Sequence, residues 1–227
     1  MSEDSQSQSN RLRQIDDYIE SLYSANDEVL DATLKSIAQN GLPPINVSAN
    51  EGKLLYMLAK ISGARKILEI GTLAGYSTIW LARALPPGGR LLTLEYDPKH
   101  AEVARANIAR AGLGGVVEVR LGAGLDLLPE IAANGEGPFD LFFIDADKGA
   151  YPDYLDWAIT LSRPGSLILS DNLIREGAVM GPNPDDQNAV AIARYNRKLA
   201  THPRLESLVL PIIREYIDGL GITLVVH

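Results

Sequence analysis

The chain has 227 residues, of which 46% are hydrophobic, which is typical of one domain with a sizeable core and not of a disordered or fibrous protein. The net charge of -8 disfavours a protein that holds nucleic acid through its phosphates, because such binding needs a basic face. Cysteine is absent, which excludes disulfides, thiolate metal ligands and thiol nucleophiles. The composition therefore favours chemistry on a small molecule.

The N-terminus is polar and acidic, and we expect residues 1–10 to form a flexible tail before a single domain over residues 11–227. It lacks the basic and then apolar pattern of a secretory signal. No apolar run in the chain approaches the ~20 residues of a membrane span. We therefore expect a cytoplasmic protein with no membrane partner.

Helical periodicity dominates the first quarter of the chain. Apolar residues at three- and four-residue spacing predict helix from Arg11 to about Gln39, with a break near residues 24–26, and a further helix over Glu51–Ile61. Gly41 and the prolines after it end the first helical region. These N-terminal helices precede a segment with a different pattern.

From Lys66 onward, short apolar runs alternate with helical segments. The runs predict strands at 66–70, 91–94, 116–121, 141–144 and 166–170, with helices between them at 76–85, 98–112, 125–132 and 151–161. A polar loop over 173–186, a helix to about Leu199 and two closing strands at 207–212 and 221–226 follow. This alternation predicts a doubly wound α/β fold, in which helices cover both faces of a mostly parallel seven-stranded sheet.

A glycine-containing turn, 67-ILEIGTLAGYS-77, joins the first predicted strand to the next helix. Gly71 and Gly75 let a ligand approach the backbone, and the helix N-terminus offers free N–H groups. Glu95 ends the following strand, 24 residues beyond Gly71, where an acid accepts hydrogen bonds from ribose hydroxyls. A tight turn without a ligand is the competing interpretation, and Glu95 favours the ligand site.

The same turn bears on which nucleotide could bind. A dinucleotide site needs a middle glycine that admits a pyrophosphate, and Leu73 occupies that position. This disfavours an NAD-dependent oxidoreductase, which stays as the less favoured alternative. A nucleoside with a ribose and no phosphate fits the turn better, and S-adenosylmethionine is such a molecule.

Polar residues cluster where the fourth and fifth predicted strands end. Asp145 follows one strand, and Asp171 and Asn172 follow its expected neighbour about 5 Å away. Two carboxylates and a carboxamide are hard oxygen ligands, which Mg²⁺, Mn²⁺ or Ca²⁺ prefers. The alternative is that both aspartates cap helices. Asp147 has three open roles, which are binding the cation through water, contacting the substrate or solvating the loop.

Lys148 lies beside this predicted cation site in the sequence. A lysine next to a dication in a partly dry pocket can serve as the general base for a substrate hydroxyl. A lysine that only balances the local negative charge is the competing interpretation. The motifs along the rest of the chain decide between these two roles, in favour of the base.

Six sequence motifs together resemble those of the cation-dependent O-methyltransferase family that includes catechol and caffeoyl-coenzyme A O-methyltransferases. They are EIGTLAGYS at 69–77, LEYDP at 94–98, LGAGLDLLP at 121–129, FIDADKGAY at 143–151, SDN at 170–172 and REYIDGL at 214–220. The similarity extends from about Asn46 to the C-terminus. It implies a Rossmann-like methyltransferase domain that acts on a small aromatic diol and uses no nucleic acid.

The resemblance also implies roles for individual residues. Asp145, Asp171 and Asn172 would be the ligands of a divalent cation, Mg²⁺ before Mn²⁺ or Ca²⁺, and Lys148 would be the catalytic base. The implied S-adenosylmethionine-binding residues are Val47 at the pocket entry, Gly71 and Ser77 by the methionine part, Glu95 by the ribose, Ala123 by the adenine, and in addition Glu69, Gly75 and Asp145. Members of the family further imply a homodimer formed through the N-terminal helices.

Two positions depart from the catechol-type branch of that family. Ile212 stands where those enzymes carry a glutamate that holds the second hydroxyl, and Asp147 replaces an apolar residue, as in the plant and bacterial branch. The expected reaction is direct methyl transfer from S-adenosylmethionine to one oxygen of a vicinal diol on an aromatic ring. Methylation of hydroxylated uridine in tRNA is the alternative, which the acidic balance disfavours. The motifs leave open the substrate, the hydroxyl that is methylated and the cation.

Overall fold

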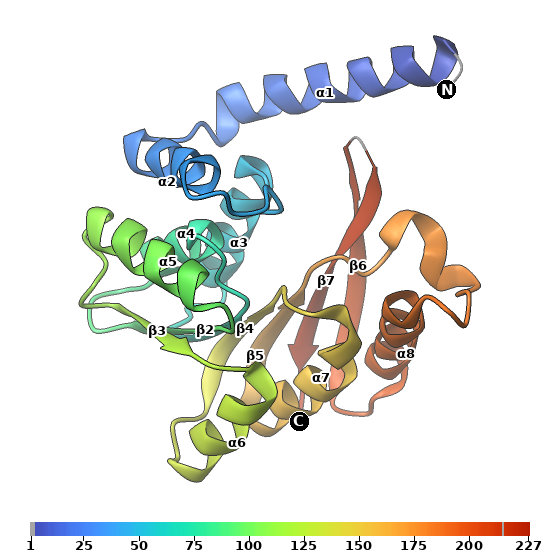
Figure 1. Ribbon diagram of the computed structural model, residues 1–227. Coiled ribbons are helices and arrows are strands. Elements are labelled where there is room, and N and C mark those ends of the chain that lie inside the picture. The colour runs from blue at the N-terminus through green and yellow to red at the C-terminus, as the bar shows by residue number, and fades with distance from the viewer. Residues whose placement is uncertain (1–2, 215) are drawn as a thin grey trace.

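A seven-stranded sheet forms the centre of the molecule, in the order β3-β2-β1-β4-β5-β7-β6 (Figure 1). The computed structural model describes residues 3–214 and 216–227, with side chains from Asn10 onward. The strands are β1 (Lys66–Ile70), β2 (Arg90–Glu95), β3 (Val117–Leu121), β4 (Phe139–Ile144), β5 (Ser162–Ser170), β6 (Leu205–Ile213) and β7 (Ile217–Val225). The first five strands are parallel, and the last two are antiparallel to their neighbours, which confirms the predicted fold class.

Helices cover both faces of this sheet, as expected from strands that are apolar on both sides (Figure 1). They are α1 (Glu3–Tyr23), α2 (Glu28–Gln39), α3 (Ala49–Ile61), α4 (Tyr76–Ala84), α5 (Pro98–Arg110), α6 (Gly124–Ala133), α7 (Tyr151–Thr160) and α8 (Gln187–Thr201). Leu68 and Phe142 point into the core beneath α6, α7 and α8, whereas Ile67 and Leu141 point into the core beneath α3 and α4. Adjacent strand residues thus supply opposite cores, because side chains alternate along a strand.

The N-terminal helix is longer than the sequence predicts. α1 begins at Glu3, so it includes most of the segment expected to be a flexible tail, while residues 1–2 lie outside the described part of the chain. No glycine or proline precedes Gly41, so nothing in the sequence ends a helix before the break at residues 24–27. Within residues 3–214 and 216–227, no helix is long and apolar enough to cross a membrane.

Local capping residues fix where the helices near the carboxyl edge of the sheet begin. Ser48 and Glu51 form a reciprocal capping box at α3, in which Glu51 N donates to Ser48 Oγ at 3.1 Å and Ser48 N to Glu51 Oε2 at 2.8 Å. Asp97 caps α5 through the backbone of Lys99, and Pro98 occupies the first turn. These caps fix the chain just before α3 and the loop between β2 and α5.

The β6–β7 hairpin extends beyond the edge of the parallel strands. β7 pairs with β5 only from Gly221 to Leu224, whereas it pairs with β6 as far as Ile217. Because β7 is antiparallel to β5, its unpaired N-terminal part projects past the carboxyl end of β5. The hairpin therefore overhangs the edge at which ligands bind in doubly wound sheets.

Candidate active site

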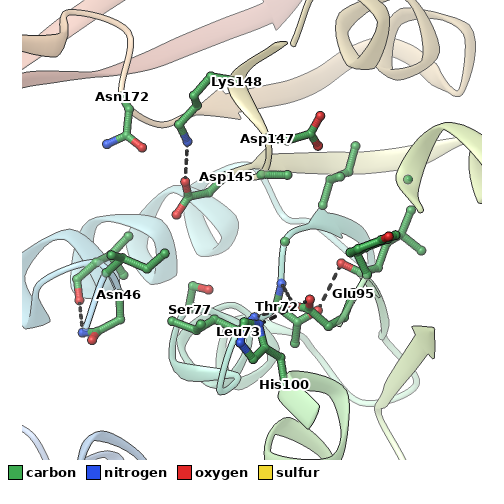
Figure 2. Close-up of a pocket in the computed structure, with 18 of the residues that line it drawn as sticks. Asn46, Thr72, Leu73, Ser77, Glu95, His100, Asp145, Asp147, Lys148 and Asn172 are labelled. Carbon is green, nitrogen blue, oxygen red and sulfur yellow. Dashed lines mark hydrogen bonds and ion pairs between the residues drawn. The ribbon is translucent and has the colours of Figure 1, made fainter. Parts of the chain in front are cut away.

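A cavity of about 1210 Å³ lies at the carboxyl ends of the parallel strands, with the β6–β7 hairpin contributing to its wall. The predicted site residues that line it are Val47, Gly71, Ser77, Glu95, Ala123, Asp145, Lys148 and Asn172. Figure 2 shows this cavity with Glu95 and the glycine turn on one side and Asp145, Lys148 and Asn172 on the other. Glu69, Gly75 and Asp171 are the predicted site residues that do not line it.

At Gly71 the backbone of the turn lies close to the carboxyl end of β4, the strand beside β1 in the sheet. Its φ is 98°, and a Cβ built there would lie 2.0 Å from the carbonyl oxygen of Asp145. Only glycine can combine that conformation with so close an approach. Gly75 also has a left-handed φ, 83°, but it starts α4 and does not line the cavity. The two glycines therefore differ, since Gly71 shapes the pocket and Gly75 shapes the turn.

Glu95 holds the glycine turn from the end of β2. Its Oε2 accepts hydrogen bonds from the backbone N–H groups of Thr72 at 3.1 Å and Leu73 at 2.8 Å, and its Oε1 accepts one from Asp97 N at 2.9 Å. An ionised carboxylate has about four acceptor positions, so one is left for a ligand hydroxyl. The predicted contact between Glu95 and a ribose stays a prediction, and its structural role in the turn was not foreseen.

Glu69 lies behind the pocket and not in it. The side chain is fully buried in β1 and accepts hydrogen bonds from Ser77 Oγ at 2.7 Å and Thr78 Oγ1 at 2.5 Å. Burial raises the pKa of this carboxyl to about 7. Because Ser77 lines the cavity, Glu69 acts on the pocket by fixing the Ser77 hydroxyl at the start of α4.

Two aspartates approach each other where β4 and β5 end, as the sequence predicts. Asp171 is almost fully buried, and burial together with the negative charges of Asp145 and Glu51 raises the pKa of its carboxyl well above the ordinary value. Asn172 follows with a left-handed φ of 60°, and its backbone N donates to Asp171 Oδ1 at 2.8 Å. The backbone therefore carries the Asn172 side chain into the cavity while Asp171 stays behind it.

The side chains of Asp145, Asp171 and Asn172 carry the oxygen atoms that a hard dication prefers. Among the described residues, no cluster of three or more His, Asp or Glu side chains is arranged to hold a metal ion. The predicted set has two carboxylates, and its third member is the amide of Asn172. Asn172 Nδ2 donates to Asp218 Oδ2 at 3.2 Å, which leaves the amide oxygen free to act as a ligand. A dication would also relieve the repulsion between Asp145 and Asp171.

Lys148 belongs to the same group of side chains. It lies in a short 3₁₀ turn, η1 (Lys148–Ala150), and its Nζ donates to Asp145 Oδ1 and to Tyr151 Oη, both at 2.9 Å. Tyr151 is fully buried and contacts the backbone carbonyls of Ile144 and Asp171. Tyr151 is thus a core residue that positions Lys148, and it does not line the cavity.

Asp147 and Ile212, the two departures from the catechol-type pattern, both lie away from the carboxylate pair. Asp147 is exposed, points away from Asp145 in Figure 2, and accepts a hydrogen bond from Tyr154 Oη at 2.5 Å. Ile212 is partly buried and packs against the core beneath α3 and α4 without lining the cavity. Neither residue therefore adds an oxygen ligand beside Asp145.

The hairpin and the loop after β5 add site residues that sequence reasoning missed. Asp218, on the overhanging part of β7, is buried and accepts hydrogen bonds from Asn172 Nδ2 and from the backbone of Ile174, Arg175 and Gly219. Arg175 and Arg214 also line the cavity. The only signal for Asp218 and Arg214 was their presence in the motif REYIDGL, which gave them no role.

Comparison with known proteins agrees with this fold and site. The family model described as O-methyltransferase matches residues 20–227. A catechol O-methyltransferase of Niastella koreensis is 48% identical over 93% of this chain and 96% of its own, and caffeoyl-CoA O-methyltransferase 1 of Eucalyptus globulus is 33% identical over 90% and 83%. The structure of an O-methyltransferase from Bacillus cereus in complex with SAH superimposes with a TM-score of 0.93, at 44% identity, over 95% of this chain and 99% of that one.

The fold and the site define a Rossmann-like methyltransferase. The chain belongs to the O-methyltransferase family, and its relatives include catechol and caffeoyl-CoA O-methyltransferases. The resemblance drawn from the six sequence motifs is therefore confirmed.

Proposed function

We propose that this protein transfers a methyl group from S-adenosylmethionine to one oxygen of a vicinal diol on an aromatic ring, with the help of a divalent cation. The observation that carries the proposal is the cavity of Figure 2, where the glycine turn and Glu95 face Asp145, Lys148 and Asn172. The relatives support it, because the Bacillus cereus protein was solved with SAH and the Niastella koreensis protein is named for catechol, a vicinal diol.

The nucleoside side of the cavity suits S-adenosylmethionine. Gly71 lets the ligand approach the backbone because it has no side chain, and Glu95 keeps one acceptor position for a ribose hydroxyl. Ala123 and Val47 both line the cavity, where Ala123 would lie by the adenine and Val47 at the pocket entry. Ser77, whose hydroxyl Glu69 fixes, would lie by the methionine part.

The opposite side of the cavity suits a diol. Asp145 and Asn172 would hold a dication through their oxygens, with Asp171 behind them, and a bound dication would supply the charge that favours an ionised hydroxyl. Lys148 Nζ is the group that would take the hydroxyl proton as the new O–C bond forms and the C–S bond breaks. The protein contributes mainly by placing the two reactants in line.

A radiolabel assay tests this function. The protein is incubated with methyl-labelled S-adenosylmethionine, Mg²⁺ and a panel of catechols, flavonoids and caffeoyl esters, and we expect label in a mono-O-methyl product. Asp145→Ala is expected to reduce turnover about 100-fold or more, whereas Asp153→Ala, an exposed aspartate on α7, serves as the matched control. Full activity in the presence of a chelator would overturn the role of the cation.

We further propose that the protein forms a homodimer through α1. This helix presents an apolar face, in which Ile15, Tyr18 and Leu22 are each at least 46% exposed, and such a face is unusual for a helix without a partner. Sedimentation should show a dimer that the double variant Tyr18→Glu, Leu22→Glu converts to a monomer. The control reverses the charges of two exposed residues on the opposite face, Arg13→Glu and Asp17→Lys, and a monomeric wild type would contradict the proposal.

A further inference from the structure

Arg175 lies at the diol side of the cavity, next to a predicted cation ligand. It begins the 3₁₀ segment η2 (Arg175–Met180), which leaves the sheet after β5, and it lines the cavity. Its backbone N donates at 3.0 Å to Asp218 Oδ1, while Oδ2 of the same carboxylate accepts from Asn172 Nδ2 at 3.2 Å. The backbone N–H of Arg175 and the side-chain amide of Asn172 are therefore bound to the two oxygens of one carboxylate, which holds them close together.

The chain holds Arg175 in an unfavourable conformation. Arg175 has a φ of 48° and Glu176 a φ of 53°, both in the left-handed region that side-chain-bearing residues rarely adopt. Such a conformation is destabilising, and Asp218 offsets part of that cost by accepting the Ile174 and Arg175 N–H groups. Strained backbone of this kind is concentrated at ligand-binding sites.

The Arg175 side chain has no counter-charge. Its Nε is buried and has no hydrogen-bond partner, and no carboxylate of the described residues forms an ion pair with its guanidinium. Arg214 and Lys148, which also line the cavity, do have carboxylate partners: Arg214 lies 3.6 Å from Glu51, and Lys148 lies 2.9 Å from Asp145. A partly buried guanidinium without an anion is costly, so this one is suited to an anion that arrives with a ligand.

We infer that Arg175 binds an acidic group on the aromatic ring of the substrate, so that the protein prefers vicinal diols that carry a carboxylate. This inference rests on the proposed function, and it names the substrate class. Because the backbone of Arg175 is anchored beside Asn172 and Arg175 lines the cavity, the proposal places the anion near the diol, on the ring itself or one atom from it. The planar guanidinium matches a carboxylate, with which it forms two parallel hydrogen bonds.

The test compares two ligands that differ in one charge, 3,4-dihydroxybenzoate and its methyl ester. Dissociation constants are measured by calorimetry with S-adenosylhomocysteine and Mg²⁺ present, and kcat/KM is measured in parallel for the wild type, Arg175→Gln and Arg175→Lys. Arg194→Gln, an exposed arginine on α8, is the matched control for loss of a positive charge. We expect the wild type to bind the acid more tightly than the ester, and Arg175→Gln to reduce that preference about tenfold or more.

Three results would overturn the role of Arg175. The first is that Arg175→Gln leaves the affinities for acid and ester unchanged. The second is an equal loss of affinity for both ligands, which indicates a loosened loop. The third is weaker binding of S-adenosylhomocysteine, which would assign the guanidinium to the methionine carboxylate. Arg175→Lys is expected to restore part of the preference, because the charge returns without the planar fork. Binding of the acid without any methylation would refute the proposed function separately, because the calorimetric comparison needs no turnover.

Discussion

Asp218 and Asn172 are joined side chain to side chain at 3.2 Å, and this contact links the β6–β7 hairpin to the mouth of β5. The same Asp218 carboxylate accepts the backbone N–H groups of Ile174, Arg175 and Gly219 at 2.8 to 3.0 Å. One buried side chain thus fixes the amide of a predicted cation ligand and the loop that follows it. We regard Asp218 as a positioning residue for the predicted cation site.

The first prediction concerns Asp218→Asn. The variant retains the shape of the side chain but replaces one acceptor oxygen with a donor, so the Asn172 amide loses its fixed orientation. Because residues behind the ligands typically contribute 10- to 100-fold to metal affinity, we expect the Mg²⁺ concentration for half-maximal activity to rise at least about tenfold. The measurement is a Mg²⁺ titration of turnover, with Asp153→Asn as control. An unchanged Mg²⁺ requirement would remove Asp218 from the site.

The second prediction separates close approach from backbone strain at the glycine turn. Gly71→Ala places a Cβ 2.0 Å from Asp145 O at a φ of 98°, whereas Gly112→Ala introduces a Cβ with nothing within 4 Å at a φ of 71°. We expect Gly112→Ala to cost about 1 kcal/mol of unfolding free energy, and Gly71→Ala to cost more and to weaken S-adenosylhomocysteine binding. Urea unfolding and calorimetry provide both values. Equal costs for the two variants would contradict the steric argument.

The sequence predicted the part of the site that follows from strand order. Asp145 comes directly after β4, and Asn172 comes two residues after the end of β5. Parallel strands bring their carboxyl ends to one edge, so the meeting of these residues needed only the fold class. Glu69 was also assigned to the cofactor, and that assignment stays a prediction. The side chain of Glu69 packs against the start of α4, so it reaches the cavity only through Ser77.

The missed residues depend on contacts between segments distant in sequence. Asp218 and Arg214 enter the site because β7 inserts between β5 and β6 and the hairpin then extends past the sheet. No local pattern encodes that insertion, since two closing strands fit several strand orders equally well. Arg175 lies in a loop whose left-handed conformation is set by Asp218, 43 residues away. Its importance was therefore hidden from periodicity and motif alike.

The third prediction concerns the pH dependence of stability through Glu69. Burial raises the pKa of this carboxyl from 4.5 to about 7 in the folded protein, so the folded state binds the proton more tightly than the unfolded state does. The stabilisation is fully present below pH 4.5 and is lost as the pH rises toward about 7, at roughly 1.4 kcal/mol per pKa unit.

A Glu69→Gln variant tests this assignment, because its side chain does not ionise. As the pH rises from 4.5 to 7.5, we expect the wild type to lose unfolding free energy relative to the variant. The loss of one hydroxyl contact, to Ser77 or Thr78, shifts the difference by a constant amount and leaves its slope intact. Parallel pH profiles for the two proteins would show that another group titrates in this range.

The last prediction concerns the effect of a divalent cation on the fold itself. The pKa of the buried Asp171 carboxyl is raised by burial and by the charge of Asp145, so protons and cations compete for the same pair. Mg²⁺ should therefore raise the melting temperature more at pH 8 than at pH 5.5, because a ligand that binds only the folded state stabilises it. Asp145→Asn should abolish most of this increase, whereas Asp140→Asn, which removes a carboxylate from the opposite end of β4, should retain it. A Mg²⁺-dependent increase of the same size in all three proteins would show that the ion binds elsewhere.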